Sequence, residues 1–133
     1  MDDLYREVII ERYKDPLYRG TLEPHDITFQ DDNPLCGDQI RIDIRLDEND
    51  IVTEAVFSGH GCAISQATAD LLIESIIGKS LEEVKKISKE DVLEMLGIEL
   101  GAVRLKCALL SLKVLKGGIY GLGSTEYLEI DEE

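Results

Sequence analysis

Residues 40–46 read Ile40-Arg41-Ile42-Asp43-Ile44-Arg45-Leu46, an alternation of apolar and charged side chains without an exception. Because successive side chains of a strand point to opposite faces, this pattern predicts a half-buried antiparallel strand. The run Asp47-Glu48-Asn49-Asp50 supplies turn residues, and residues 51–58 are expected to return as a partner strand. With a short strand over 25–30, the stretch 25–58 predicts a small three-stranded antiparallel sheet.

The segments on either side of this sheet have the patterns of helices. Residues 4–14 are dense in helix formers and end at Asp15-Pro16. After residue 62 the spacing predicts a helix over 63–76, and capping patterns at Ser80 and Ser88 predict two shorter helices. An apolar helix is expected over 102–116, stopped by Gly117-Gly118. The predicted fold is α+β, with the helices packed on one face of the sheet.

Length and charge restrict the class of protein. A chain of 133 residues fits one domain, expected over 1–120 and followed by an acidic tail over 121–133. Lys and Arg number 14 against 28 Asp and Glu, a net charge of −14. Such a charge repels phosphates, so we expect no nucleic acid and no anionic membrane as partners. With no apolar stretch of about 18 residues and an acidic start, a cytoplasmic protein with reduced thiols is expected.

Three cysteines, Cys36, Cys62 and Cys107, lie 26 and 45 positions apart, too far for a zinc ribbon or a CxxC redox pair. An odd number of cysteines in a reducing compartment argues against disulfides and favours metal binding or sulfur chemistry. Two interpretations remain open from spacing alone. Either each cysteine is a small buried apolar residue, or the fold gathers all three into one site.

The surroundings of each cysteine favour a shared site. Cys36 lies in a loop before the strand, where Gly37 allows a turn that aims Cys36 and Asp38 at a common point. Cys62 begins the helix expected at 63, where amide N–H groups stabilise a thiolate. Together with Cys107, these residues make three sulfur ligands and one oxygen, a set suited to zinc or an iron–sulfur cluster.

Basic residues and histidines near the cysteines are further candidate residues of the site. Arg104 and Lys106 flank Cys107, and their positive charges favour its thiolate form. His60, two residues before Cys62, is expected to be exposed rather than a ligand, and His25 to be a surface residue.

The sequence segments around the cysteines resemble the motifs of a known family. Asn33-Pro34-Leu35-Cys36-Gly37-Asp38, Gly59-His60-Gly61-Cys62-Ala63-Ile64-Ser65-Gln66-Ala67 and Arg104-Leu105-Lys106-Cys107-Ala108 closely resemble the three cysteine motifs of the IscU/SufU/NifU N-terminal domain family, whose members serve iron–sulfur cluster assembly. The resemblance covers about residues 2–116. It implies that Cys36, Asp38, Cys62 and Cys107 hold a [2Fe–2S] cluster or Zn²⁺. It also implies a cysteine desulfurase and iron–sulfur acceptor proteins as partners, and leaves open a homo-oligomer.

Within this family the subtype stays open. IscU-type scaffolds carry His before the third cysteine, whereas Lys106 stands there as in SufU-type proteins, with Arg104 two residues earlier. The short interval between the second and third cysteines is instead IscU-like. The first hypothesis is a scaffold for [2Fe–2S] clusters, with Cys107 as persulfide acceptor. The alternatives are a zinc-dependent sulfurtransferase using Cys36, or a zinc-stabilised adaptor. Lys106 and Arg104 give electrostatic support. The first two hypotheses describe a scaffold or sulfur carrier rather than a conventional enzyme.

Overall fold

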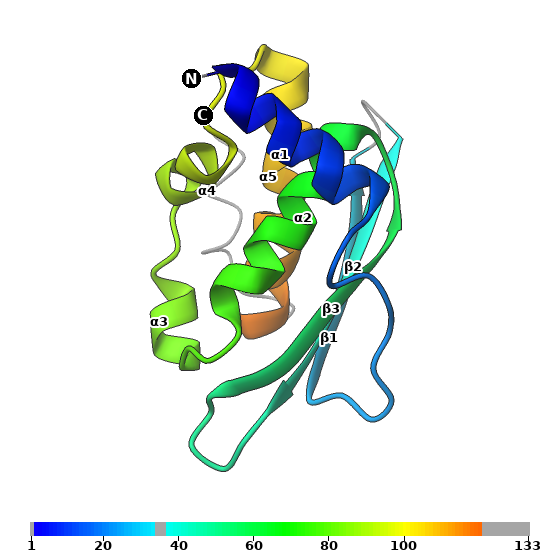
Figure 1. The fold of residues 1–133 in the computed structure, drawn as a ribbon. Coiled ribbons are helices and arrows are strands. Elements are labelled where there is room, and N and C mark those ends of the chain that lie inside the picture. The colour runs from blue at the N-terminus through cyan, green and yellow to red at the C-terminus, as the bar shows by residue number, and fades with distance from the viewer. Residues whose placement is uncertain (1, 34–36, 121–133) are drawn as a thin grey trace.

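The computed structural model describes residues 2–33 and 37–120, which form a sheet covered by helices (Figure 1). The elements in chain order are α1 (Asp2–Lys14), β1 (Ile27–Asn33), β2 (Asp38–Leu46), β3 (Val52–His60), α2 (Ala63–Ile76), α3 (Leu81–Lys85), α4 (Lys89–Leu96) and α5 (Ala102–Tyr120). The α+β class expected from the sequence is confirmed. Cys36 and the expected acidic tail lie outside the described residues.

The sheet is antiparallel with strand order β1-β2-β3, and its centre is the alternating stretch 40–46. Ile42 lies between Phe29 of β1 and Phe57 of β3, and Ile40, Ile42 and Ile44 are at most 2% exposed. β1 begins at Ile27 and continues to Asn33, later than the expected 25–30. Its extent is set by pairing with β2 in the register Asn33 opposite Asp38, which the sequence of β1 alone does not reveal.

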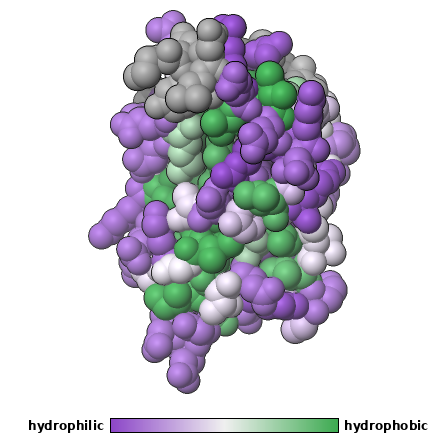
Figure 2. Space-filling view, viewed as in Figure 1, coloured by the Kyte–Doolittle hydropathy of each residue, from purple (hydrophilic) through white to green (hydrophobic). Residues whose placement is uncertain are grey.

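The helices pack on one face of this sheet (Figure 1). α2 lies against β3, α5 against β1 and β2, and α1 against α2. The core between them consists mainly of Ile, Leu and Val side chains. Hydrophilic residues cover most of the face seen in Figure 2, in keeping with the charge of −14. Among the described residues, no helix is long and apolar enough to cross a membrane.

The two short helices begin where their sequences predict, but α3 ends at Lys85 and not at the expected Ile87. Ser80 and Glu83 form a capping box at α3, and Ser88 and Asp91 form one at α4. These reciprocal hydrogen bonds satisfy backbone donors that have no partner inside the helix. α4 ends at Gly97 in the left-handed conformation, with φ of 66°.

The predicted end of the last helix is wrong. α5 continues through Gly117 and Gly118 to Tyr120 instead of stopping at residue 116. A Cβ on Gly117 would lie 2.7 Å from Cε2 of Phe29, and one on Gly118 would lie 3.0 Å from Cγ2 of Ile27. The glycines therefore allow α5 to approach β1 closely, and tertiary packing outweighs their low helix propensity.

The connector over residues 15–26 fastens α1 to the rest of the domain. Asp70 of α2 is fully buried, and it accepts hydrogen bonds from Arg12 Nη1 and the Tyr18 N–H, both at 2.8 Å. Arg12 also pairs with Glu74. Burial opposes the charge of Arg12, but its bonds to these two carboxylates outweigh burial and raise its pKa. These bonds to Asp70 and Glu74 therefore fix the end of α1 and the start of the connector against α2.

The connector then passes over the outer face of the sheet and buries Asp43, which the alternating pattern had placed on the charged face. Asp43 is 1% exposed and accepts hydrogen bonds from Arg41 Nε (2.9 Å), Thr28 Oγ1 (2.7 Å) and the Leu22 N–H (3.1 Å). Burial alone raises the pKa of Asp43, but these three donors outweigh it and leave the pKa below its ordinary value. The bond to Asp43 correspondingly raises the pKa of Arg41. Asp43 is therefore a structural anchor.

Candidate metal centre

Three potential ligands from distant parts of the chain meet at one end of the sheet. Asp38 is the first residue of β2, Cys62 lies between β3 and α2 at the N-cap position of α2, and Cys107 lies in the first half of α5. Each offers one ligand atom, and these atoms all lie within 4.8 Å of one another. The antiparallel pairing causes this meeting, because the start of β2 and the end of β3 lie side by side.

Asp38 is held in place by the backbone that leads into α2. Its carboxylate is 1% exposed, and Oδ1 accepts the Cys62 N–H at 3.1 Å. Oδ2 lies 3.8 Å from Sγ of Cys62, so the other oxygen faces the cysteine sulfurs. A Cβ on Gly61 would lie 2.6 Å from Oδ1, so only glycine leaves room for the carboxylate there. Asp38 is thus both a candidate ligand and part of the support for Cys62.

Cys62 is exposed, whereas Asp38 and Cys107 are buried. Its carbonyl accepts hydrogen bonds from Ser65 Oγ and the Gln66 N–H, each at 3.1 Å, and this fixes the first turn of α2. The side chain of Cys62 forms no capping bond to α2. The site is therefore covered on its inner side and open to solvent at Cys62.

The donor set fits a metal ion. In a tetrahedral zinc site with Zn–S of about 2.3 Å, neighbouring ligand atoms lie roughly 3.5–4 Å apart. The 3.8 Å between Cys62 Sγ and Asp38 Oδ2 agrees with this spacing. Two soft sulfurs and one hard oxygen suit zinc or iron and exclude a site built for calcium or magnesium, which take oxygen ligands. The described residues supply three candidate ligands and leave a fourth position. Cys107 is disulfide-bonded in the structure, unlike the reduced thiols expected from the sequence, so its sulfur must be reduced before it can bind a metal.

The remaining predicted residues differ in their placement. Cys36 lies outside the described residues, but the chain on either side is fixed, since the Gly37 N–H bonds to the Asn33 carbonyl at 2.9 Å. Gly37 has a φ of 71°, in keeping with the tight turn expected there. Arg104 and Lys106 are exposed, and within the described part of the chain neither forms an ion pair.

The two histidines differ in their exposure. His60 is exposed at the end of β3 and is not part of the ligand group found among the described residues. His25 is part-buried, and its Nδ1 lies 3.0 Å from the Leu22 carbonyl at the other end of the sheet. The expectation that neither histidine is a metal ligand stays a prediction.

Comparison with known proteins decides the family. Residues 4–126 match the family model described as the NifU-like N terminal domain. The chain belongs to this family. A zinc-dependent sulfurtransferase SufU from Bacillus subtilis is 37% identical, covering 90% of this chain and 91% of that protein. An iron–sulfur cluster assembly scaffold protein IscU from Haemophilus influenzae is 34% identical, covering 86% and 92%. The resemblance noted in the cysteine motifs is confirmed.

Solved structures share the fold of this NifU-like domain. A SufU protein of the iron–sulfur assembly system from Fervidobacterium islandicum superposes with a TM-score of 0.75 at 28% identity, covering 85% of this chain and 94% of that one. A NifU-like N-terminal protein from Brucella abortus reaches 0.71 at 18% identity, covering 90% and 94%, which shows the fold alone.

Sequence reasoning missed residues that support the ligands. Gly61, Ser65 and Gln66 lie inside the second cysteine motif, yet nothing in their spacing shows that they position Cys62 and Asp38. Arg19, which bonds to Gly59 and Gln66 on either side of Cys62, lies far from every cysteine in sequence. The sequence shows only a single arginine in the connector, and this does not identify Arg19 as a residue of the site.

Proposed function

We propose that the protein is an iron–sulfur cluster assembly scaffold. It takes sulfur from a cysteine desulfurase, holds a [2Fe–2S] cluster as cargo on Cys36, Asp38, Cys62 and Cys107, and transfers it to acceptor proteins. The observation that carries this proposal is the meeting of one carboxylate and two cysteine sulfurs within 4.8 Å at one partly open end of the sheet. We place this activity in the cytoplasm, where thiols stay reduced.

The ligand chemistry suits a cargo that must leave again. A carboxylate is a harder ligand than a thiolate, so Asp38 is the ligand whose bond to iron exchanges most readily. Because Cys62 is exposed, an acceptor's cysteine can approach from that side while Asp38 and Cys107 remain covered. A permanent electron carrier needs the opposite arrangement, with thiolate ligands and a closed site.

The basic residues beside the site provide a place for sulfur delivery. Arg104 and Lys106 are exposed near the start of α5, on a protein whose net charge is −14. Their charges favour the approach of an anionic persulfide and stabilise a thiolate. Cys107, the expected acceptor in a scaffold, is only 2% exposed, so sulfur delivery to it requires its covering side chains to move apart.

A second candidate is a zinc-dependent sulfurtransferase. The described donors are compact enough for a single ion, and Lys106 occupies the position that is His in IscU-type scaffolds. Asp38, Cys62 and Cys107 would then hold zinc together with Cys36. Bound zinc would keep these thiols deprotonated and in place. Cys36 would be the nucleophile that takes sulfur from the desulfurase.

Metal and sulfide analysis after anaerobic purification tests both candidates. A scaffold loaded with its cargo should contain close to two iron and two sulfide per monomer, and reconstitution with iron and sulfide should restore them. Tightly held zinc that resists replacement, together with faster cysteine turnover by the desulfurase that Cys36→Ala abolishes, would exclude the scaffold and favour the transferase. A protein that takes up neither cluster nor sulfur would contradict both proposals.

A further inference from the structure

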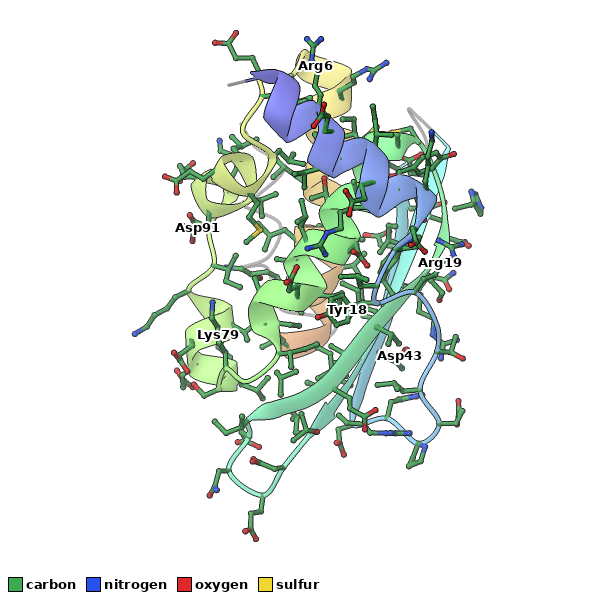
Figure 3. The ribbon with its side chains drawn as sticks, viewed as in Figure 1. Arg6, Tyr18, Arg19, Asp43, Lys79 and Asp91 are labelled. Carbon is green, nitrogen blue, oxygen red and sulfur yellow. The ribbon has the colours of Figure 1, made fainter. Side chains whose placement is uncertain are left out.

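Arg19 lies on the connector after α1 and is fixed beside β3. The Phe57 N–H bonds to the Tyr18 carbonyl at 3.0 Å, and the Gly20 N–H bonds to the Phe57 carbonyl at 2.8 Å, so the backbone on both sides of Arg19 is paired. The guanidinium carbon lies 5.7 Å from the centre of the Phe57 ring, a cation–π distance. Figure 3 shows Tyr18 and Arg19 beside β3. The position of the guanidinium is therefore set by the sheet.

The guanidinium joins the two sides of the segment that carries Cys62. Nη2 donates to the carbonyl of Gly59, three residues before Cys62, and Nη1 donates to Oε1 of Gln66, four residues after it. The Gln66 N–H in turn donates to the Cys62 carbonyl. These bonds close a ring that runs from Cys62 through Gln66 and Arg19 to Gly59 and back along the chain.

The other parts of this segment have little freedom. Gly59 has a φ of 123°, and a Cβ there would lie 2.1 Å from the Gln39 carbonyl oxygen, so β3 lies too close to β2 at this point for any side chain. Asp38 holds the Cys62 N–H from the side of the ligands. Arg19 holds the same segment through Gly59 and Gln66, from the connector that bridges β3 at Phe57 rather than from β2.

Gln66 depends on Arg19 for its buried side chain. The residue is 6% exposed, and Nε2 has no hydrogen-bond partner among the described residues. Since a guanidinium only donates, Arg19 fixes Oε1 as the atom that faces it. Without Arg19, Oε1 would lose this bond and neither polar atom of the buried amide would have a hydrogen-bond partner among the described residues, which is unfavourable.

We propose that Arg19 is a positioning residue for the metal centre, which keeps Cys62 at bonding distance from the ion that Asp38 and Cys107 share. This inference rests on the proposed function, since it assumes that the three residues bind a metal. The role requires a planar guanidinium group, whose two terminal nitrogens donate to two acceptors at once. Lysine carries the same charge as a single point on a flexible chain and does not replace it.

The test compares Arg19→Met and Arg19→Lys with a matched control, Arg45→Met. Arg45 also ties the connector to the sheet, donating to the carbonyls of Glu23 and Pro24, but at the end away from the candidate site. Amide hydrogen exchange at Cys62 is measured in the metal-free protein. Cobalt(II) is then used as a probe, with its visible absorption and its dissociation constant measured by competition with a chelator.

Both Arg19 variants should exchange the Cys62 amide proton about tenfold faster and bind cobalt about tenfold more weakly, with lower intensity in the bands of tetrahedral cobalt. Arg45→Met should match the unsubstituted protein in both measurements. Unchanged exchange and cobalt binding in Arg19→Met would overturn the inference, as would equal changes in Arg45→Met. If the unsubstituted protein binds no cobalt, the proposed function fails. The exchange rates then decide separately whether Arg19 holds Cys62.

Discussion

Replacement of Gly61 by alanine should displace the Asp38 carboxylate without a change in any ligand. The added Cβ would lie 2.4 Å from Oγ of Ser65 and 2.6 Å from Oδ1 of Asp38, whereas real Cβ contacts are essentially never below 3.0 Å. Ser65 and Asp38 are each 1% exposed, so neither has free space to move into. Gly61 has no left-handed φ, and the cost of the substitution is therefore steric alone.

The expected magnitudes follow from this crowding. Overpacking of a buried site costs about 1–3 kcal/mol of unfolding free energy. A shift of the carboxylate should weaken zinc binding about tenfold to a hundredfold, the range for residues that orient metal ligands. Zinc affinity is measured by competition with a chromogenic chelator, and stability by urea unfolding of the metal-free protein.

Controls separate the effect on the site from the effect on folding. Gly101→Ala adds a Cβ with no atom within 4 Å and should leave zinc affinity unchanged. In Gly61→Ala combined with Asp38→Ala, the clash with the carboxylate is gone, so the two losses in affinity should not add. Zinc binding by Gly61→Ala as tight as that of the unsubstituted protein would refute the role assigned to the position of Asp38.

Four further outcomes are expected. Gly117→Ala should lower the unfolding free energy by about 1 kcal/mol in urea titrations, because crowding against Phe29 exceeds a gain in helix propensity of about 1 kcal/mol. The lowered pKa of Asp43 stabilises the fold above the unfolded pKa of about 3.9, and this contribution is lost as pH falls through the folded pKa. Asp43→Asn should accordingly flatten the fall in urea midpoint below about pH 4, and an unchanged pH profile would contradict this. Lys106→Glu should slow desulfurase-dependent sulfur uptake about tenfold with no change in unfolding midpoint, because the side chain is exposed. Asp38→Ala should slow the loss of a reconstituted cluster, followed by visible absorption, and faster loss would argue against the carboxylate as the exchangeable ligand.

Local patterns predicted most of the elements, and the exceptions have a common cause. The alternation of residues 40–46 and the capping boxes at Ser80 and Ser88 involve neighbours in sequence, so they could be recognised before any contact was known. The predicted helix end at Gly117 was wrong, and the burial of Asp43 on the charged face of the strand was not predicted. Each depends on a segment far away in the chain, β1 in the first case and the connector in the second.

The features of the candidate site also separate into those set by sequence neighbours and those set by distant segments. The motifs around Cys36, Cys62 and Cys107 pointed to the family and to the candidate ligands, because each motif is a short stretch of neighbouring residues. The assignment of Cys36 as a ligand stays a prediction. The sequence did not show that Asp38 bonds to the Cys62 N–H, or that Cys62 is the exposed member of the group.

By itself, the sequence determined the α+β class, the family and the chemical nature of the candidate ligands, because periodicity, caps and motifs are properties of neighbouring residues. Only the tertiary structure decided how the ligands are held. The antiparallel pairing of β2 with β3 brings Asp38 to Cys62, and the connector brings Arg19 to the chain on either side of the same cysteine. These contacts join residues 24 to 47 positions apart and form only when the chain has folded, so no pattern of neighbouring residues predicts them.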